Sequence, residues 1–317
     1  MCTEAHRGEP NMKIAFWSSA RGSIGVTSNL ACVSIAMAFE SSCKTMLLEN
    51  HYQKNPLENM LIHRQDQKLV KNTIGTNRYR GLEHIINQMW KEQEKRRYYY
   101  SEVQNGKMQE EMWTLHDLHP KEKKLFYKKN EKLMKEASVE ILINSLYYLP
   151  TGNHFNQSIF DYTLNDNIMK ILWASENFAP YTFIDTSNEN NLSSKIILEE
   201  VDIVVVTLMP QQDVIEQFFR NYSSLLSKCI ILLNLSKNNN SQISNISSKY
   251  SFQLSRIIPI PYNMEYSQAI LQGRVVEFMM RNYRCKSEHP NYPFINSIRH
   301  VSAVLQRIQD KSLGCKN

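Results

Sequence analysis

Short apolar segments alternate with longer amphipathic segments over most of this chain. The short segments are rich in β-branched and aromatic residues, which is typical of strands covered on both faces. We expect such strands at 13–17, 45–48, 146–149, 181–185, 202–207, 229–234 and 256–261. The amphipathic segments predict helices at 28–40, 164–177, 192–200 and 211–226. Strands and helices that alternate at this spacing predict an α/β fold with a doubly wound, mostly parallel sheet.

Residues 59–140 differ from the rest of the chain, because they are rich in Lys, Glu, Arg and Gln. Helical runs at 81–97 and 121–143 indicate a charged helical insertion in one domain of residues 12–311, with a tail at 312–317. A mixed-charge helix is usually a solvated surface, although a partner-docking surface has the same pattern. Basic and aromatic residues mix at 90–100, so stacking on nucleic-acid bases is a further, less favoured interpretation.

Composition narrows the possible classes of protein. No window offers the roughly 18 uninterrupted apolar residues that a membrane-spanning helix needs, and residues 1–11 lack the apolar core of a secretory signal. These residues precede Met12 and the first strand, so they indicate either a disordered extension or a misplaced start. The six cysteines show no metal-ligand spacing and indicate reduced thiols in a cytoplasmic protein. The net charge of +6 permits an anionic partner without specifying one.

The most informative local pattern follows the first predicted strand. A strand, a glycine loop and a helix are the layout of a P-loop, whose backbone N–H groups face a phosphate beside a helix N-terminus. The end of the usual pattern, G-x-x-x-x-G-K-[ST], corresponds to Gly25, Val26 and Thr27. The lysine that normally contacts the nucleotide phosphates is therefore replaced by valine. The candidate nucleotide-binding residues of this loop are Arg21, Gly22, Ser23, Ile24, Gly25, Val26, Thr27 and Ser28.

The order of motifs along the chain resembles the ParA/MinD family of deviant-Walker P-loop ATPases. The resemblance covers nearly the whole chain outside 1–11 and 59–140, and it implies a P-loop NTPase fold of the SIMIBI type. It rests on the segments 21–31, 46–52, 181–186, 231–234 and 258–263, with Ala269 and 273–276 after them. The lost lysines and the segments F-W-S, F-I-D-T-S and I-P-Y-N look most like the TadZ/CpaE branch of this family. That branch is associated with tight-adherence (Flp) pilus secretion.

The resemblance also implies a ligand and a partner. An adenine nucleotide, ATP or ADP, would bind at the glycine loop with Mg²⁺, and Thr27 and Asp185 would hold the metal. Arg21 matches a lysine that reaches the partner's nucleotide across a dimer, so a homodimer is implied. The remaining nucleotide-contacting residues would be Asn234, Pro261 and Tyr262. Plainer interpretations remain open, namely a surface arginine, a hydroxyl that caps a helix, and polar residues that simply end a strand.

Catalysis is the property that we expect least of this site. Hydrolysis needs a phosphate-bound cation, a metal and a group that orients the attacking water. Val26 supplies no cation, and Asn50 cannot act as a base if it stands at the water-orienting position. Glu49 is one residue away, but a one-residue shift in a strand points the side chain to the other face. Asp185 is then the remaining candidate for a catalytic carboxylate, and we expect weak or absent ATPase activity.

These expectations lead to two functions. The first is a nucleotide-binding localisation scaffold for a pilus or secretion assembly, placed in the cytoplasm, at a cell pole or at the inner face of the membrane. The second is an active partition or septum-positioning ATPase that uses Arg21 in place of lysine. Near the C-terminus, an apolar stripe predicts a helix that docks on the core, although a basic amphipathic helix can also contact an anionic membrane. The stripe consists of Ile295, Ile298, Val301, Val304, Leu305 and Ile308.

Overall fold

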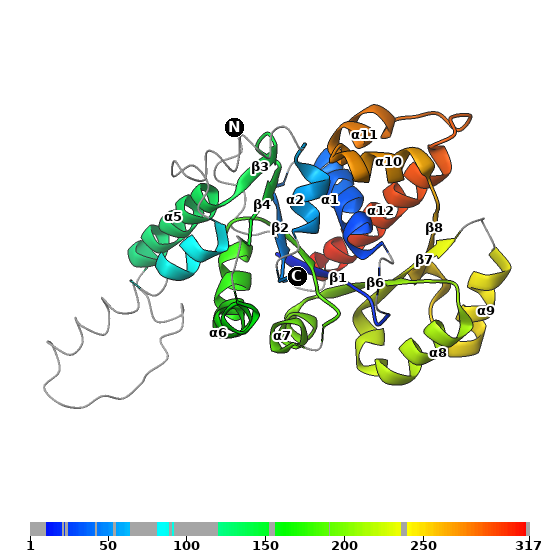
Figure 1. The fold of residues 1–317 in the computed structure, drawn as a ribbon, viewed down its shortest axis with the longest axis horizontal. Coiled ribbons are helices and arrows are strands. Elements are labelled where there is room, and N and C mark those ends of the chain that lie inside the picture. Colours follow the sequence, from blue (N-terminus) through cyan, green and yellow to red (C-terminus); the bar gives the residue numbers. More distant parts are fainter. Residues whose placement is uncertain are drawn as a thin grey trace, which may run out of the picture.

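An eight-stranded sheet forms the centre of the structure (Figure 1). The computed structural model describes residues 11–20, 22, 25–41, 43–52, 55–63, 81–88, 91, 120–151, 156–189, 191–235 and 240–314. The strands are β1 (Met12–Trp17), β2 (Thr45–Glu49), β3 (Val139–Leu142), β4 (Leu146–Tyr148), β5 (Tyr181–Asp185), β6 (Ile203–Leu208), β7 (Cys229–Leu235) and β8 (Ile257–Pro261). Their order is β3-β4-β2-β5-β1-β6-β7-β8, and every pair is parallel except β3 with β4. The predicted doubly wound, mostly parallel α/β sheet is confirmed.

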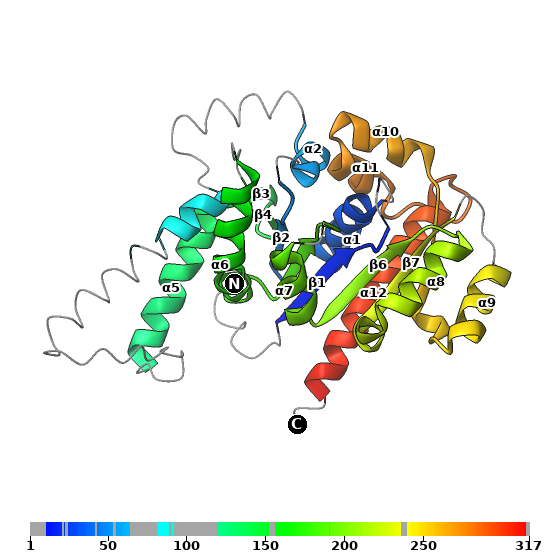
Figure 2. The same ribbon diagram turned by 60° about the horizontal axis from the view of Figure 1, so that its bottom comes forward.

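Helices cover both faces of the sheet (Figures 1 and 2). One layer contains α1 (Val26–Glu40), α2 (Pro56–Leu61), α10 (Met264–Gln272), α11 (Val275–Asn282) and α12 (Tyr292–Gly314). The other contains residues 81–88, α5 (Pro120–Ala137), α6 (Gln157–Glu176), α7 (Leu192–Glu200), α8 (Gln212–Asn221) and α9 (Asn240–Tyr250). Burial on both faces explains why the central strands are apolar along their whole length.

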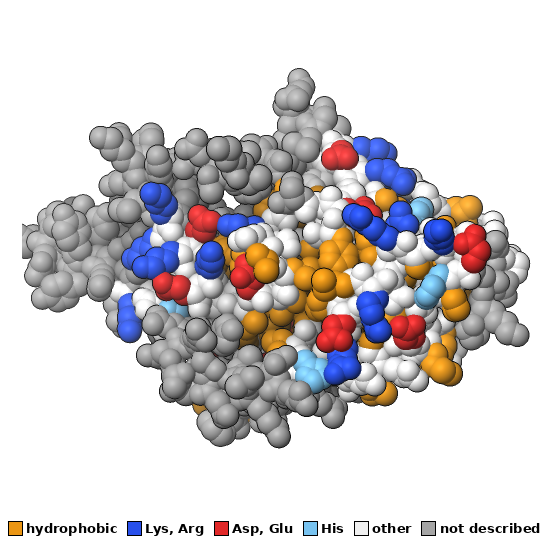
Figure 3. Space-filling view, turned by 90° about the horizontal axis from the view of Figure 1, so that it is seen from above, with side chains coloured by type: hydrophobic (Ala, Val, Ile, Leu, Met, Phe, Trp, Pro, Cys, Tyr) orange, Lys and Arg blue, Asp and Glu red, His pale blue; other side chains and the backbone are white. Residues whose placement is uncertain are grey.

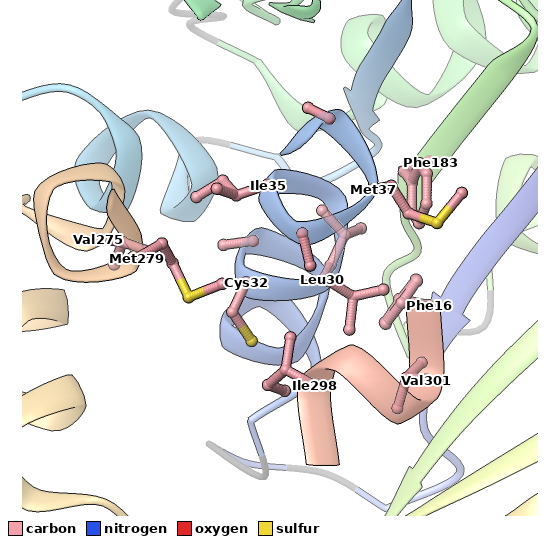
Figure 4. Packing of buried hydrophobic residues seen from close by; sticks show 14 of the residues in the cluster. Phe16, Leu30, Cys32, Ile35, Met37, Phe183, Val275, Met279, Ile298 and Val301 are labelled. Carbon is pink, nitrogen blue, oxygen red and sulfur yellow. The ribbon is translucent and has the colours of Figure 1, made fainter. Parts of the chain in front are cut away.

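Helix α1 packs on the sheet among the other helices of its layer (Figure 4). Its side chains contact β1 and β5 on one side and α11 and α12 on the other, with Leu30, Cys32 and Ile35 fully buried. Residues 29–38 of α1 are all buried and mostly apolar, as expected of a helix segment that is covered on all sides. This packing fixes the N-terminus of α1 at the carboxyl end of β1, where the glycine loop lies.

The structure corrects the helix predicted over 121–143. Helix α5 ends at Ala137, and residues 139–142 form β3, an antiparallel edge strand beside β4. A tight turn joins the two strands, with Asn144 at φ 57°, a left-handed conformation that asparagine tolerates better than most residues. Hairpin pairing with β4 therefore decides the structure of a segment whose composition suits a helix. The extent of the charged insertion at 59–140 stays a prediction, since the segments 64–80 and 92–119 lie outside the described residues.

Other predicted boundaries also move. Helix α6 starts at Gln157 rather than near 164, because the side chain of Asn156 caps it by accepting hydrogen bonds from the backbone N–H groups of Ser158 and Ile159. The helix predicted over 211–226 is divided into α8 and a short 3₁₀ helix at Ser223–Lys228. The predictions for residues 1–10 and for the mixed aromatic and basic segment at 90–100, apart from residue 91, lie outside the described residues.

Helix α12 carries the predicted C-terminal stripe. Ile295, Ile298, Val301 and Leu305 are at most 1% exposed, and Val304 and Ile308 pack against the same core. The expected docking of this helix on the domain is therefore confirmed. No helix among the described residues is long and apolar enough to cross a bilayer. Figure 3 shows hydrophobic side chains gathered near the middle of the face seen from above, with Lys and Arg side chains around them.

Strand β8 forms one edge of the sheet and contains two prolines. The backbone N–H of Tyr262 donates to the carbonyl of Leu235, so the N–H groups that share its orientation face β7. Alternate residues of a strand direct their N–H groups to opposite sides. Pro259 and Pro261 therefore occupy outward positions of β8, where an ordinary residue would present a free donor.

Candidate functional site

The glycine loop places an open helix N-terminus at the centre of the sheet. Gly25 stands at the N-cap of α1 in a left-handed conformation, with φ 83°, and no side chain caps the helix. A Cβ on Gly25 would lie 3.0 Å from Nδ2 of Asn234, so glycine is required here for both conformation and space. The first backbone N–H groups of an uncapped helix attract anions, because they lack intrahelical partners and carry the positive end of the helix dipole.

The structure brings Thr27 and Asp185 together. Oγ1 of Thr27 donates a hydrogen bond of 2.6 Å to Oδ2 of Asp185, across two elements that are far apart in sequence. Asp185 is fully buried at the end of β5, and its Oδ1 atom has no hydrogen-bond partner in the described part of the chain. The hydroxyl of Ser28 instead donates to the carbonyl of Gly25 at 3.0 Å and so fastens the loop to α1.

His51 is a member of this cluster that the sequence analysis did not assign. Its Nε2 atom lies 3.1 Å from Oδ2 of Asp185, the same oxygen that Thr27 contacts, and its side chain is 20% exposed. Burial alone would lower the pKa of His51, but contact with Asp185 and the negative charge of that carboxylate outweigh burial and raise the pKa. The sequence signal for His51 was its position just after the predicted strand β2, because parallel strands end at the same edge of a sheet and β5 also ends there.

Glu49 and Asn50 point to opposite sides of β2, as their alternation requires. Glu49 is buried, accepts a hydrogen bond from the hydroxyl of Tyr148, and accepts another from the backbone of Leu57 at 3.5 Å. The side chain of Asn50 is buried among three serines: it accepts from the backbone N–H of Ser187 at 2.6 Å and donates to the hydroxyls of Ser193 and Ser194 at 3.2 and 2.9 Å. Both side chains are engaged within the fold, and neither is in contact with Thr27.

The remaining predicted residues lie along the same edge of the sheet. Oδ1 of Asn234 accepts a hydrogen bond of 3.4 Å from Asn29 of α1, so Asn234 stands against the glycine loop. Pro261 ends β8, and Tyr262 after it is 66% exposed. Gly22 is exposed with φ 108°. Three further predicted residues, Arg21, Ser23 and Ile24, lie outside the described residues.

The donor chemistry beside Asp185 suits a small divalent cation. Mg²⁺ prefers hydroxyl and carboxylate oxygens and is usually held by one or two protein groups together with phosphates and waters. Thr27 supplies a hydroxyl, and Oδ1 of Asp185 is a buried oxygen without a hydrogen-bond partner among the described residues. Thr27 and Asp185 are therefore the residues that would hold Mg²⁺, which when bound neutralises charge on the phosphates. In the part of the chain that the structure describes, no three His, Cys, Asp or Glu side chains form a metal centre by themselves.

Comparison with solved structures identifies the fold. A ParA-family ATPase from Chlorobium tepidum is similar with a TM-score of 0.58 and 13% identity, over 93% of this chain and 98% of that one. MinD from Pyrococcus horikoshii, complexed with Mg-ADP, has a TM-score of 0.57 and 13% identity, with coverages of 94% and 98%. A MinC:MinD complex from Aquifex aeolicus gives 0.55 and 12%, with coverages of 93% and 95%. No protein-family model matches the chain, and no curated protein matches it in sequence.

The chain therefore has the fold of the ParA/MinD P-loop ATPases. An eight-stranded, mostly parallel sheet with helices on both faces carries the glycine loop at the end of β1, next to β5 in the sheet order. The identities of 12–13% establish the architecture alone, so the function has to be argued from the residues of the site.

Proposed function

We propose that this chain binds an adenine nucleotide at the glycine loop and works as a nucleotide-dependent localisation protein with little or no ATPase activity. The observation that carries the proposal is the uncapped N-terminus of α1 behind Gly25, with the Thr27–Asp185 pair beside it. Backbone N–H groups at a helix N-terminus bind phosphate without help from a lysine. The Mg-ADP complex of MinD from Pyrococcus horikoshii, which has a similar fold, supports the same ligand class.

We expect weak ATP hydrolysis because of the contacts that the described side chains make within the fold. Val26 is partly buried and packs against the core around α1, so the lysine position supplies no charge to the phosphates. Glu49 is held by Tyr148 and Leu57, and Asn50 is held by the loop after β5 and the start of α7. Neither is positioned by these contacts to orient a water at the glycine loop. Asp185 remains the candidate carboxylate, and Thr27 and His51 already approach it.

The lysine position gives a direct test of nucleotide binding. Isothermal titration with ATP and ADP would compare the wild type, Val26→Lys and the size control Val26→Met. A hydrogen bond to a charged group contributes roughly 1.5–3 kcal/mol, so Val26→Lys is expected to tighten binding by about one to two decades. Val26→Met should leave the affinity unchanged. The proposal fails if the wild type binds neither nucleotide, whether or not Val26→Lys binds one.

We also propose that nucleotide binding promotes a homodimer through the glycine-loop face, and that this dimer determines where a pilus or secretion assembly forms. The homodimer is supported by exposed apolar side chains just after β8, where Tyr262 and Met264 are 66% and 67% exposed. The role in locating an assembly is supported by the likeness to the TadZ/CpaE branch. Sizing by light scattering with and without ATP should show a doubling of mass. A strictly monomeric, nucleotide-loaded protein would contradict the dimer.

An active partition or septum-positioning ATPase is the second candidate. It is favoured by the similar structures, which include a ParA-family ATPase and the MinC:MinD cell division complex. In this case Arg21 would take over the role of the missing lysine. A turnover assay with DNA or lipid vesicles should then detect ATP hydrolysis that is lost in Arg21→Ala. Hydrolysis that survives Arg21→Ala would exclude the proposed role of Arg21.

A further inference from the structure

A hydroxyl group from α10 contacts the first turn of α1. The hydroxyl of Tyr266 donates a hydrogen bond of 2.5 Å to the backbone carbonyl of Ser28. The N–H of the same peptide unit, which belongs to Asn29, donates to the carbonyl of Gly25 at 2.9 Å, and the hydroxyl of Ser28 donates to that carbonyl at 3.0 Å. Because hydrogen bonds in a chain polarise one another, the Tyr266 hydroxyl strengthens the bond from Asn29 to the carbonyl of Gly25.

The carbonyl of Gly25 fixes the direction of the next backbone N–H group. That N–H belongs to Val26 and lies in the same planar trans peptide unit, so it points opposite to the carbonyl. Since the carbonyl is held within the first turn of α1, the N–H of Val26 points out of the helix N-terminus, where phosphate is expected. Glycine is conformationally permissive, so this peptide unit depends on the bonds to its carbonyl for its orientation.

Tyr266 is itself held in place through both its ring and its backbone. It is 5% exposed, and its ring centroid lies 4.7 Å from that of Phe294 and 5.3 Å from that of Phe278. Its backbone N–H donates at 2.7 Å to Oδ1 of Asn263, the N-cap of α10. The hydroxyl therefore reaches Ser28 from a packed part of the core.

We propose that Tyr266 is a positioning residue for phosphate binding, whose hydroxyl orients the first turn of α1 so that the N–H of Val26 meets the phosphate. This inference rests on the proposed nucleotide-binding function and adds a residue of α10 to it. The buried Oδ1 of Asp185, which has no partner among the described residues, lies in the same cluster as Thr27 and independently indicates a ligand at this end of α1. With valine at the lysine position, the backbone N–H groups are the phosphate donors whose orientation matters most.

The test compares the full-length wild type with Tyr266→Phe, which removes the hydroxyl and keeps the ring. The control Tyr283→Phe removes the same group from another buried tyrosine, whose hydroxyl contacts Glu40 at the opposite end of α1. Isothermal titration measures the affinity for ADP, and displacement of ADP measures the affinity for adenosine, which has the base and sugar without phosphate. Circular dichroism melting curves verify that each variant is folded.

Tyr266→Phe should weaken ADP binding by about three- to tenfold, because the ligand must then order a turn that the hydroxyl already holds in the wild type. A factor of this size corresponds to the loss of one neutral hydrogen bond. Adenosine affinity should change by less than about twofold, as should both affinities in Tyr283→Phe. A general loosening of the site would instead weaken ADP and adenosine alike.

The amide signal of Val26 gives a second measurement, which needs no change at Tyr266. Selective ¹⁵N-valine labelling of the wild type reports this N–H by NMR, and the signal that disappears in Val26→Ile identifies it. Addition of ADP should move the signal to higher proton frequency, as expected when an N–H donates to phosphate, and adenosine should leave it in place.

The outcomes separate this inference from the proposed function. If the wild type binds ADP and Tyr266→Phe binds it equally well, or loses ADP and adenosine affinity together, Tyr266 does not position the phosphate donor and nucleotide binding still stands. A Val26 amide signal that ADP does not move would also overturn the inference. If the wild type binds no ADP, the proposed function fails, and this inference fails with it.

Discussion

Replacing Glu49 by glutamine is expected to change how the stability of this protein depends on pH. Glu49 ends β2 and is 4% exposed, with its carboxyl group against the hydroxyl of Tyr148. Burial raises the pKa of Glu49 from 4.5 to about 8; the hydrogen bond from Tyr148 opposes that rise, and the charge of Asp185 adds to it. At neutral pH the folded protein therefore keeps a proton on Glu49 that the unfolded chain has released.

The sign and size of the effect follow from proton linkage. Between the unfolded pKa of 4.5 and the folded pKa of about 8, the unfolded state binds fewer protons, so raising the pH favours unfolding. Each pH unit in this window lowers the free energy of unfolding by about 1.4 kcal/mol. From about pH 5.5 to about pH 7.5, Glu49 alone lowers the free energy of unfolding by about 3 kcal/mol. Below the unfolded pKa the effect is absent, and above the folded pKa it stops growing.

Urea unfolding followed by circular dichroism at several pH values measures this effect. Glutamine keeps an oxygen acceptor for the Tyr148 hydroxyl but carries no titrating proton. The free energy of unfolding of Glu49→Gln minus that of the wild type should rise by about 3 kcal/mol over the two pH units. The control Glu277→Gln, at a side chain that is 58% exposed, should run parallel to the wild type. Parallel curves for Glu49→Gln as well would refute the buried, protonated carboxyl group.

Three further substitutions test the packing around the site, each by urea unfolding. Gly273→Ala should lower the free energy of unfolding by about 2 kcal/mol or more, because φ is 69° and a Cβ would lie 2.9 Å from two backbone oxygens of the α2 region. The control Gly22→Ala should lower it by less, because a Cβ there meets no atom within 4 Å. Ile298→Ala should lower the free energy of unfolding by about 2–5 kcal/mol, since Ile298 is fully buried against α1. A change near zero would mean that α12 does not dock there. Asn50→Ala should lower the free energy of unfolding by about 1–3 kcal/mol, because it leaves the buried N–H of Ser187 without its acceptor. Unchanged stability would contradict the Asn50 contacts.

Much of the fold was predictable because apolar periodicity reports burial directly. The central strands β1, β2, β5, β6 and β7 are covered on both faces, and their uninterrupted apolar runs have no other simple explanation. The edge strand β3 lacks this signal. It reads V-E-I-L after a Lys- and Glu-rich helix, and only its pairing with β4, which local sequence does not encode, makes it a strand. Tertiary contacts override local preference most easily at such an edge.

The sequence predicted the backbone elements that carry the site, but it did not predict which side chains from other elements lie beside them. The strand, glycine loop and helix locate Gly25 and Thr27, and the end of a buried strand locates Asp185. The role of His51 depends on which strand lies beside β2, because the order β2-β5-β1 is what brings Asp185 next to it. Periodicity finds strands but does not order them, and a single histidine has no spacing to reveal it.

The two prolines of β8 limit how copies of this chain can associate. A foreign strand arriving at that edge would meet carbonyl acceptors but would find no N–H group at Pro259 or Pro261. Intermolecular sheet extension is thereby disfavoured at β8 and left to the short strand β3 at the opposite edge. Larger assemblies of this chain should therefore grow through contacts between helices and loops, which ligands and partners can reverse, and not through continuous β-fibrils.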